Sequence, residues 1–323
     1  MSDYQTPDIV KNNICKLSAL ISFLLFFSIA AACSDEVNDE GVAPKPLQGL
    51  KLVTIGDSQT SICGWQPLLQ QLTGIDWSRE ETVDGVDGHD PMAKGGTQLK
   101  PSYEGGIMQR GLDAIYYDPD VIIIYAGQND PLIVYLSAGN TGTTPLEQVG
   151  QESPIVSKEI KHGVSAISAL RGLIEYLQDS LPQTQIYLMT HVPILGVVGM
   201  NPTGDFASQY PSPRFSTQQD VIDYEMSERY PKDELIRAVG QYYDLPVIDN
   251  WKYSGITFDN VQDYYDSPSG DCTQVHLNAK GDSLLACNVA NYLLYAPCFY
   301  APDWSPEDID SGNYSALCAS SSY

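Results

Sequence analysis

The chain has 323 residues, of which 43% are hydrophobic and 18% charged, so it is long enough for a large domain with a substantial core. Its formal net charge of -24 excludes binding to nucleic acid or to anionic lipid headgroups through a basic patch, because a polyanion repels phosphate groups. The charge is spread along the chain without a long acidic block, as on the surface of a soluble secreted protein.

Residues 1–32 have the pattern of a secretory signal peptide. Lys11 and Lys16 precede the apolar run LSALISFLLFFSIAAA, which ends in small residues, and Cys33 follows at once. This arrangement resembles a bacterial lipobox, although Ala30 stands where leucine is preferred. The resemblance implies that Cys33 becomes a lipidated N-terminus, which would anchor an exported protein in the outer membrane. The acidic stretch that follows, Ser34-Asp35-Glu36, resembles the start of surface-exposed lipoproteins. A transmembrane anchor is the alternative, since the length of the run is close to the ~17 residues needed to span a bilayer.

The next segment, residues 33–48, is acidic and then contains proline, which predicts a flexible tether. We expect one folded domain over residues 49–297. Residues 298–323 are irregular and rich in serine, which predicts a C-terminal tail.

Apolar runs along the domain predict the strands of a parallel sheet. The run VIIIYAG is continuous and β-branched, which is typical of a strand buried on both faces. Strands are expected at Leu50–Ile55, Val121–Ala126, Gln185–Thr190 and Leu245–Ile248, with a weaker one around Thr82–Val86.

Segments with helical periodicity lie between these strands. Helices are expected at Gln66–Leu72, Gly106–Tyr116, Val156–Ser180, Asp220–Tyr243 and Ala279–Leu294. Alternation of strands and helices implies parallel strands with right-handed crossovers. The predicted fold class is therefore α/β, a three-layer α/β/α sandwich with a flavodoxin-like parallel sheet of about five strands. In such sheets the functional crevice lies beyond the carboxyl ends of the strands.

Residues with catalytic potential follow the predicted strands. Ser58 follows the first strand, Gly95 and Gly96 follow the weak one, Asn129 follows the VIII strand, and His276 precedes the last helix. A serine hydroxyl becomes a nucleophile when a base such as imidazole takes its proton. Backbone N–H groups and a side-chain amide can bind the oxyanion that forms. Each of these motifs alone is also an ordinary turn, but their order and their places at strand ends favour catalysis.

The four segments GDSQT, GGT, GQND and VHLNAKG resemble, in this order, the four sequence blocks of the SGNH/GDSL hydrolase family. The resemblance implies the SGNH hydrolase fold and a carboxylic ester hydrolase. It assigns Ser58 as the nucleophile and His276 as the base. It assigns Asn129, with the N–H of Ser58 and that of Gly95 or Gly96, to the oxyanion hole; the spacing to the following threonine favours Gly95.

The last block departs from the family pattern. An aspartate normally stands three residues before the histidine, and here Thr273 occupies that position. Asp271 would orient His276 in its place, or the enzyme would use a Ser-His dyad with Thr273 or a backbone carbonyl holding the ring. A third interpretation is an impaired site.

Five cysteines follow the predicted lipidation site, so at least one stays free or pairs with another chain. They are Cys63, Cys272, Cys287, Cys298 and Cys318. Export permits disulfides. Cys298 and Cys318 bracket the tail and form one expected pair. Cys63 and Cys272 form a bolder one, since it would tie together the two catalytic loops.

The substrate is expected to be a small-molecule or polysaccharide ester, and the reaction is the removal of O-acetyl or similar acyl groups from carbohydrate. No cofactor is expected. No metal is expected either, since the cysteines match no zinc spacing and the acidic loop around His89 has no calcium-loop pattern. Two alternatives stay open: a catalytically impaired, glycan-binding lipoprotein on the same fold, and a lipase or phospholipase.

Overall fold

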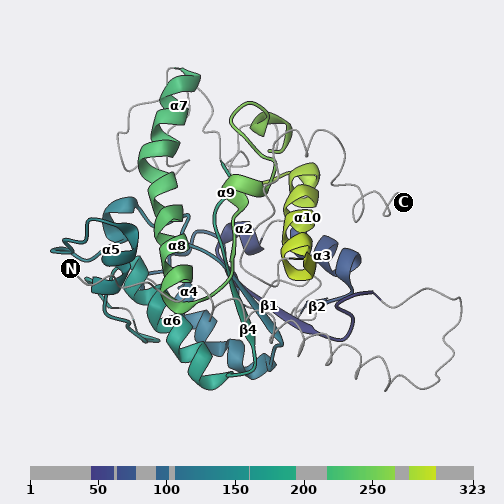
Figure 1. Ribbon diagram of the computed structural model, residues 1–323, viewed down its shortest axis with the longest axis horizontal. Helices are drawn as coiled ribbons and strands as arrows, with labels where there is room; N and C mark the ends of the chain where they lie inside the picture. The colour runs from purple at the N-terminus through teal and green to yellow at the C-terminus, as the bar shows by residue number, and fades with distance from the viewer. Residues whose placement is uncertain are drawn as a thin grey trace, which may run out of the picture.

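The computed structural model in Figure 1 describes residues 45–61, 64–77, 92–101, 106–159, 161–193, 217–265 and 276–295. None of the helices within these ranges has the length and apolar character needed to cross a bilayer. The predicted signal peptide, Cys33 and the tail lie outside the described residues. The lipid anchor therefore stays a prediction.

A five-stranded parallel sheet forms the centre of the fold. Its strands are β1 (Lys51–Gly56), β2 (Asp76–Trp77), β3 (Val121–Tyr125), β4 (Gln185–Met189) and β5 (Val247–Ile248). Their order is β2-β1-β3-β4-β5, and every neighbouring pair is parallel. This is the flavodoxin-like order, so the predicted fold class is confirmed.

Helices cover both faces of the sheet, because each central strand is apolar on both sides. All of β3 is buried, and successive strand residues belong to two separate hydrophobic clusters. One face packs against α4 (Ile107–Gly111), α6 (Ala166–Ser180) and α8 (Tyr230–Tyr243). The other face packs against α3 (Trp65–Thr73) and α10 (Ala279–Tyr295). Figure 1 shows these two groups of helices on opposite sides of the strands.

The long helix predicted over Val156–Ser180 is confirmed only in its C-terminal part. α6 begins at Ala166, where the hydroxyl of Ser165 caps the helix by accepting a hydrogen bond from the N–H of Ser168. Gly163 has a φ of 78°, a left-handed conformation that a right-handed helix does not contain.

The predicted helix over Asp220–Tyr243 is interrupted by a π-helical segment. α7 (Gln218–Tyr224) leads into residues 225–229, where the N–H of Tyr230 donates to the carbonyl of Glu225, five residues earlier. Pro231 follows at the start of α8. Since proline has no N–H and crowds the carbonyl four residues before it, it disturbs the regular hydrogen-bond ladder here.

Around β1 the neighbouring segments differ from those expected. The predicted strand at Thr82–Val86 lies outside the described residues. On the side of β1 that faces away from β3, the described neighbours are β2 and a single bridge from Gly56 to Ala93. At the start of the fold, the N–H of Leu47 donates to the carbonyl of Thr73 at 2.8 Å, so packing begins within the last residues of the segment expected as a tether.

The segment between β3 and α6 contains a helix that the sequence analysis did not predict. α5 (Pro145–Gln151) begins with a capping box, in which Thr144 and Glu147 bond each other's backbone N–H groups. Shorter elements complete the described fold: α2 (Ser58–Ser61), α9 (Asn250–Tyr253), and 3₁₀ segments at Leu112–Tyr117, Leu132–Val134 and Val261–Asp263.

A buried carboxylate, Glu152, anchors this insertion. It accepts hydrogen bonds from the N–H and hydroxyl of Ser137 at 2.8 and 2.7 Å, from Asn140 at 2.7 Å and from Ser168 at 2.9 Å, and a further one from Ser165. Burial alone would raise the pKa of Glu152, but these hydrogen bonds outweigh it and hold the pKa below its ordinary value of 4.5.

Replacing Glu152 with glutamine is expected to lower the free energy of unfolding by about 1–3 kcal/mol near neutral pH, because donors would lose their ionised acceptor. The folded-state pKa lies below the unfolded one, so this stabilisation is present above the ordinary pKa and is lost as the pH falls through the folded-state value. Urea unfolding of both proteins across this pH range measures the effect. The exposed Glu159→Gln is the control. A difference that does not shrink at acidic pH would contradict the expectation.

Candidate active site

The turn after β1 places Ser58 at the carboxyl edge of the sheet, half-buried, as the first residue of the four-residue helix α2. The chain folds tightly here because Gly56 has no side chain. A Cβ at this position would lie 2.1 Å from the hydroxyl oxygen of Thr60 and 2.3 Å from the carbonyl oxygen of Tyr125. The Thr60 hydroxyl instead donates to that carbonyl at 3.2 Å, which locks the turn against β3.

Asp57, immediately before Ser58, joins this turn to the loop after β3. Its buried carboxylate accepts hydrogen bonds from the N–H of Gln59 at 3.1 Å and from the N–H of Gln128 at 3.3 Å. Burial raises the pKa of Asp57, while nearby His191 and these two N–H groups act in the opposite direction. Asp57 therefore fixes the position of Ser58 relative to the loop after β3.

Gly95 and Gly96 lie beside the serine turn. The preceding residues run parallel to the end of β1: the N–H of Gly56 donates to Met92, and the N–H of Lys94 donates to Gly56, both at 3.3 Å. Both glycines are exposed, and Gly96 has a φ of 72°, which favours glycine. Their backbone N–H groups are thus at the edge of the sheet where the sequence predicted them.

Asn129 is half-buried in the turn after β3, and two hydrogen bonds orient it toward the glycine segment. Its side-chain amide nitrogen donates to the backbone carbonyl of Thr97 at 3.0 Å, and its backbone carbonyl accepts from the side-chain amide of Gln98 at 2.9 Å. The first bond uses one N–H of the amide and so sets the direction of the second. The structure therefore brings the turns of Ser58, Gly96 and Asn129 together.

Asp130 also joins the turn after β3 to the segment that follows Gly96. Its buried carboxylate accepts from the N–H of Leu99 at 2.7 Å and from that of Lys100 at 3.4 Å. Burial raises the pKa of Asp130 to about 7 in spite of these bonds.

His276 is half-buried and lies three residues before the start of α10. Leu277, the next residue, forms a bridge with Tyr265, and the N–H of Gly64 donates to Asp282 at 2.8 Å. The second contact ties the segment after the serine to the helix after the histidine. In the described residues no hydrogen bond joins the Ser58 hydroxyl to His276. Catalytic hydrogen bonds often tighten only in the substrate complex, and the approach of the two side chains stays a prediction.

Several sequence predictions fall outside the described residues. Asp271, Thr273, Cys33 and the expected Cys63–Cys272 and Cys298–Cys318 pairs are among them. Cys287 lies in α10 and is disulfide-bonded, although neither expected pair includes it. Among the residues that the structure describes, no group of three or more His, Cys, Asp or Glu side chains is arranged to hold a metal ion.

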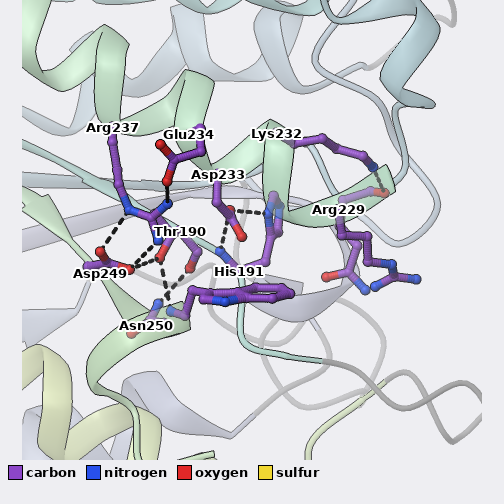
Figure 2. A network of polar contacts seen from close by, with 12 residues as sticks. Thr190, His191, Arg229, Lys232, Asp233, Glu234, Arg237, Asp249 and Asn250 are labelled. Atoms are coloured by element: carbon purple, nitrogen blue, oxygen red, sulfur yellow. Dashed lines mark hydrogen bonds and ion pairs between the residues drawn. The ribbon is translucent and has the colours of Figure 1, made fainter. Parts of the chain in front are cut away.

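Two neighbouring residues of α8 that the sequence analysis did not single out reach two loops of the site (Figure 2). Asp233 accepts from the backbone N–H of His191 at 2.9 Å and bonds its ring Nδ1 at 2.7 Å. Lys232 donates its ammonium to the carbonyl of Gln128 at 3.2 Å. The side chains of His191, Lys232 and Asp233 are all at least nine-tenths buried.

The periodicity of α8 contained a signal for these two residues. Ile236 and Val239 are buried, and extending their face one turn toward the N-terminus reaches Lys232 and Asp233. Charged residues at core positions of a helix that covers the sheet are unusual unless they are paired.

A second network holds the carboxyl ends of β4 and β5 (Figure 2). Arg237 donates two hydrogen bonds to Asp249, each 2.8 Å, and the hydroxyl of Thr190 donates to the same carboxylate at 3.1 Å. Asn250 donates to the carbonyl of Thr190, and Asn288 donates to Asn250, both at 2.8 Å. The network joins α10, the helix after His276, to the sheet.

Comparison with known proteins gives one family. The family model described as GDSL-like Lipase/Acylhydrolase matches residues 53–284. Solved structures with similarity include a carbohydrate esterase family 3 protein from Talaromyces cellulolyticus, at 14% identity and a TM-score of 0.42, covering 76% of this chain and 97% of that chain. A family 3 carbohydrate esterase from Clostridium thermocellum has 16% identity and a TM-score of 0.41, with coverages of 76% and 94%. A protein from Lactobacillus plantarum has 15% identity and a TM-score of 0.47, with coverages of 76% and 97%. No curated protein sequence matches.

Proposed function

The chain belongs to the GDSL-like lipase/acylhydrolase family and is therefore a hydrolase of ester bonds, and we propose that it is an exported serine esterase that removes O-acetyl or similar acyl groups from carbohydrate. In this proposal Ser58 is the nucleophile and His276 the general base. Asn129 and the backbone N–H groups of Ser58 and of Gly95 or Gly96 form the oxyanion hole.

One observation carries this assignment: three turns from distant parts of the chain are bonded to one another at one edge of the sheet. The Asp57 carboxylate bonds the N–H of Gln128, Gly56 bridges Ala93, and the Asn129 amide donates to Thr97. A nucleophile and a set of donors fixed in advance are what acyl transfer requires, because preorganised donors need not reorganise as charge develops.

The reaction proceeds through an acyl-enzyme. The Ser58 hydroxyl attacks the ester carbonyl carbon while His276 takes its proton, and the tetrahedral oxyanion is held by the donors named above. The alcohol then leaves with the proton from His276, and Ser58 carries the acyl group. A water molecule, deprotonated by His276, attacks the carbonyl carbon of this ester; the bond to the Ser58 oxygen breaks, His276 returns the proton to that oxygen, and the acid is released.

If Asp271 orients His276, Asp271→Ala is expected to lower kcat by at least about tenfold, because the imidazolium loses its charge partner. Steady-state hydrolysis of p-nitrophenyl acetate measures the change, with the exposed Asp179→Ala as a control. Unchanged turnover would remove Asp271 from the site and leave a dyad held by Thr273 or a backbone carbonyl.

An aromatic group near the site supports a carbohydrate substrate. The ring of Trp251 is half-buried, 5.4 Å from the ring centroid of Tyr230 and 6.0 Å from that of Phe258. The backbone N–H of Trp251 donates to the Thr190 hydroxyl, which places the aromatic group at the carboxyl ends of β4 and β5. Rings of this kind offer flat apolar surfaces against which a sugar ring can pack.

Export and a lipid anchor at Cys33 belong to the same proposal. The disulfide of Cys287 supports export, since disulfides persist in oxidising compartments outside the cytoplasm. Radiolabelled palmitate fed to cells that produce the protein tests the anchor: label is expected on the wild type and not on Cys33→Ser.

Acetate release from a panel of acetylated polysaccharides tests the substrate. A p-nitrophenyl ester series from acetate to octanoate is run beside it, with Ser58→Ala as the control. Acetate release that depends on Ser58, with the short esters preferred, is expected. A preference for long chains would indicate a lipase, and no Ser58-dependent hydrolysis of any ester would contradict the proposal.

A further inference from the structure

A buried lysine lies directly behind the loop that carries Asn129. Lys232 is 5% exposed, and its ammonium group donates to the carbonyl of Gln128 at 3.2 Å. The two residues are 104 positions apart, and Figure 2 shows the lysine side chain reaching from α8 to this contact. The ammonium also lies 5.5 Å from the ring centroid of Tyr135.

Placing an ammonium group here is unfavourable. Burial lowers the pKa of Lys232 to about 8, with Arg229 acting in the same direction. Asp130, Asp233 and Glu225 partly offset this by favouring the charged form. An apolar side chain of similar length would fill the same space without loss of hydration, so the useful part of Lys232 is its hydrogen-bonding group.

The carbonyl group that accepts the hydrogen bond from Lys232 controls the backbone at Asn129. It belongs to the peptide group that joins Gln128 to Asn129, so its orientation sets the backbone direction from which the Asn129 side chain projects. Tyr135 holds the preceding carbonyl, that of Gly127, with its hydroxyl at 2.8 Å. Asp57 accepts from the N–H of Gln128 on the other side.

Lys232 supplies the charged donor in this arrangement. The next residue of α8, Asp233, bonds His191, which is the second residue after β4. The turn of α8 that carries Lys232 is therefore held against the sheet, and this fixes the position of the lysine backbone.

We propose that Lys232 is a positioning residue which, by holding the Gln128–Asn129 peptide group, keeps the Asn129 amide directed at the oxyanion of the reaction. The inference rests on the proposed function of Asn129. Because the lysine acts through another residue, its loss lowers transition-state stabilisation and leaves ground-state binding nearly unchanged.

A double-mutant cycle tests the inference. Lys232→Met is expected to lower kcat on p-nitrophenyl acetate by between about 10- and 10²-fold with little change in KM, as for a small misplacement of a catalytic group. In an Asn129→Gly background the same substitution is expected to change kcat by less than about twofold, since residues that act as a unit are not additive. Lys232→Arg, which keeps a charged donor, is expected to recover part of the activity. Equal losses in both backgrounds would overturn the inference.

Two further measurements separate this inference from the proposed function. Hydrogen exchange of the Gly127–Asp130 amides is expected to accelerate in Lys232→Met and to stay unchanged in Lys51→Met, which removes an exposed lysine at the opposite end of β1. Unaltered exchange at this loop would overturn the positioning role whatever the activity. Wild-type turnover in Ser58→Ala would instead overturn the proposed function, and the exchange data would still decide on Lys232. If Lys232→Met does not fold, Lys232→Gln replaces it in both measurements.

Discussion

Ser58→Ala is expected to lower kcat by at least about 10³-fold. The alanine variant has no atom that can form the acyl bond, so only the oxyanion donors and substrate binding would still contribute to the rate. The fold should not change, because the turn is held by Asp57 and Thr60 and the Ser58 hydroxyl makes no hydrogen bond with a described residue.

The matched control for this prediction is Ser61→Ala, at the other end of the same short helix and equally half-buried. It is expected to keep wild-type turnover. Labelling with a fluorophosphonate provides a readout independent of substrate: the mass increase is expected on Ser58 in the wild type and absent from Ser58→Ala. Labelling or turnover that survives the Ser58 substitution would move the nucleophile elsewhere.

Asn129→Ala is expected to lower kcat by about 10²–10³-fold, the usual consequence of removing one donor from an oxyanion hole. The reason lies in the bonding of its amide. One N–H of the side-chain amide already donates to the backbone carbonyl of Thr97, and Gln98 donates to the backbone carbonyl of Asn129. The remaining N–H is thereby fixed in direction before substrate arrives, so its contribution appears in the transition state and not in KM.

Steady-state kinetics and thermal unfolding distinguish this role from a structural one. Loss of the Thr97 contact should lower stability only modestly, by about 0.5–1.5 kcal/mol for a neutral hydrogen bond. Asn291→Ala, on a half-buried position of α10, serves as the control with unchanged kinetics. A fall in kcat no larger than the fall caused by that control, or a change confined to KM, would exclude Asn129 from the oxyanion hole.

The sequence was sufficient for the three longer strands, because burial on both faces produces a continuous apolar run; the two-residue strand β2 (Asp76–Trp77) was not predicted. The run Val121–Tyr125 is apolar throughout, and a strand between two helix layers has no solvent-facing positions. Strands at Lys51–Gly56 and Gln185–Met189 were found for the same reason. Parallel strands gather their carboxyl ends at one edge, so the positions of the Ser58 and Asn129 turns followed from the chain order alone.

Helix boundaries were less predictable where a local cap decided them. The periodicity before Ala166 continued without a break in the sequence, and the capping hydroxyl of Ser165 set the actual start. Pro231 was visible in the sequence, but the π-helical turn ahead of it depends on how the preceding residues pack. α5 is seven residues long and is held by the carboxylate of Glu152 at its end, so its stability comes mainly from contacts.

The sequence by itself therefore determined the fold class, four of the five strands and the turns that carry the proposed nucleophile and oxyanion donors. Only the tertiary structure showed that Lys232 and Asp233 bond the loops after β3 and β4, because their partners, Gln128 and His191, are 104 and 42 residues away. Apolar burial follows a repeating pattern that a sequence displays. A buried charge is stabilised by a few specific partners, and their positions exist only once the chain has folded.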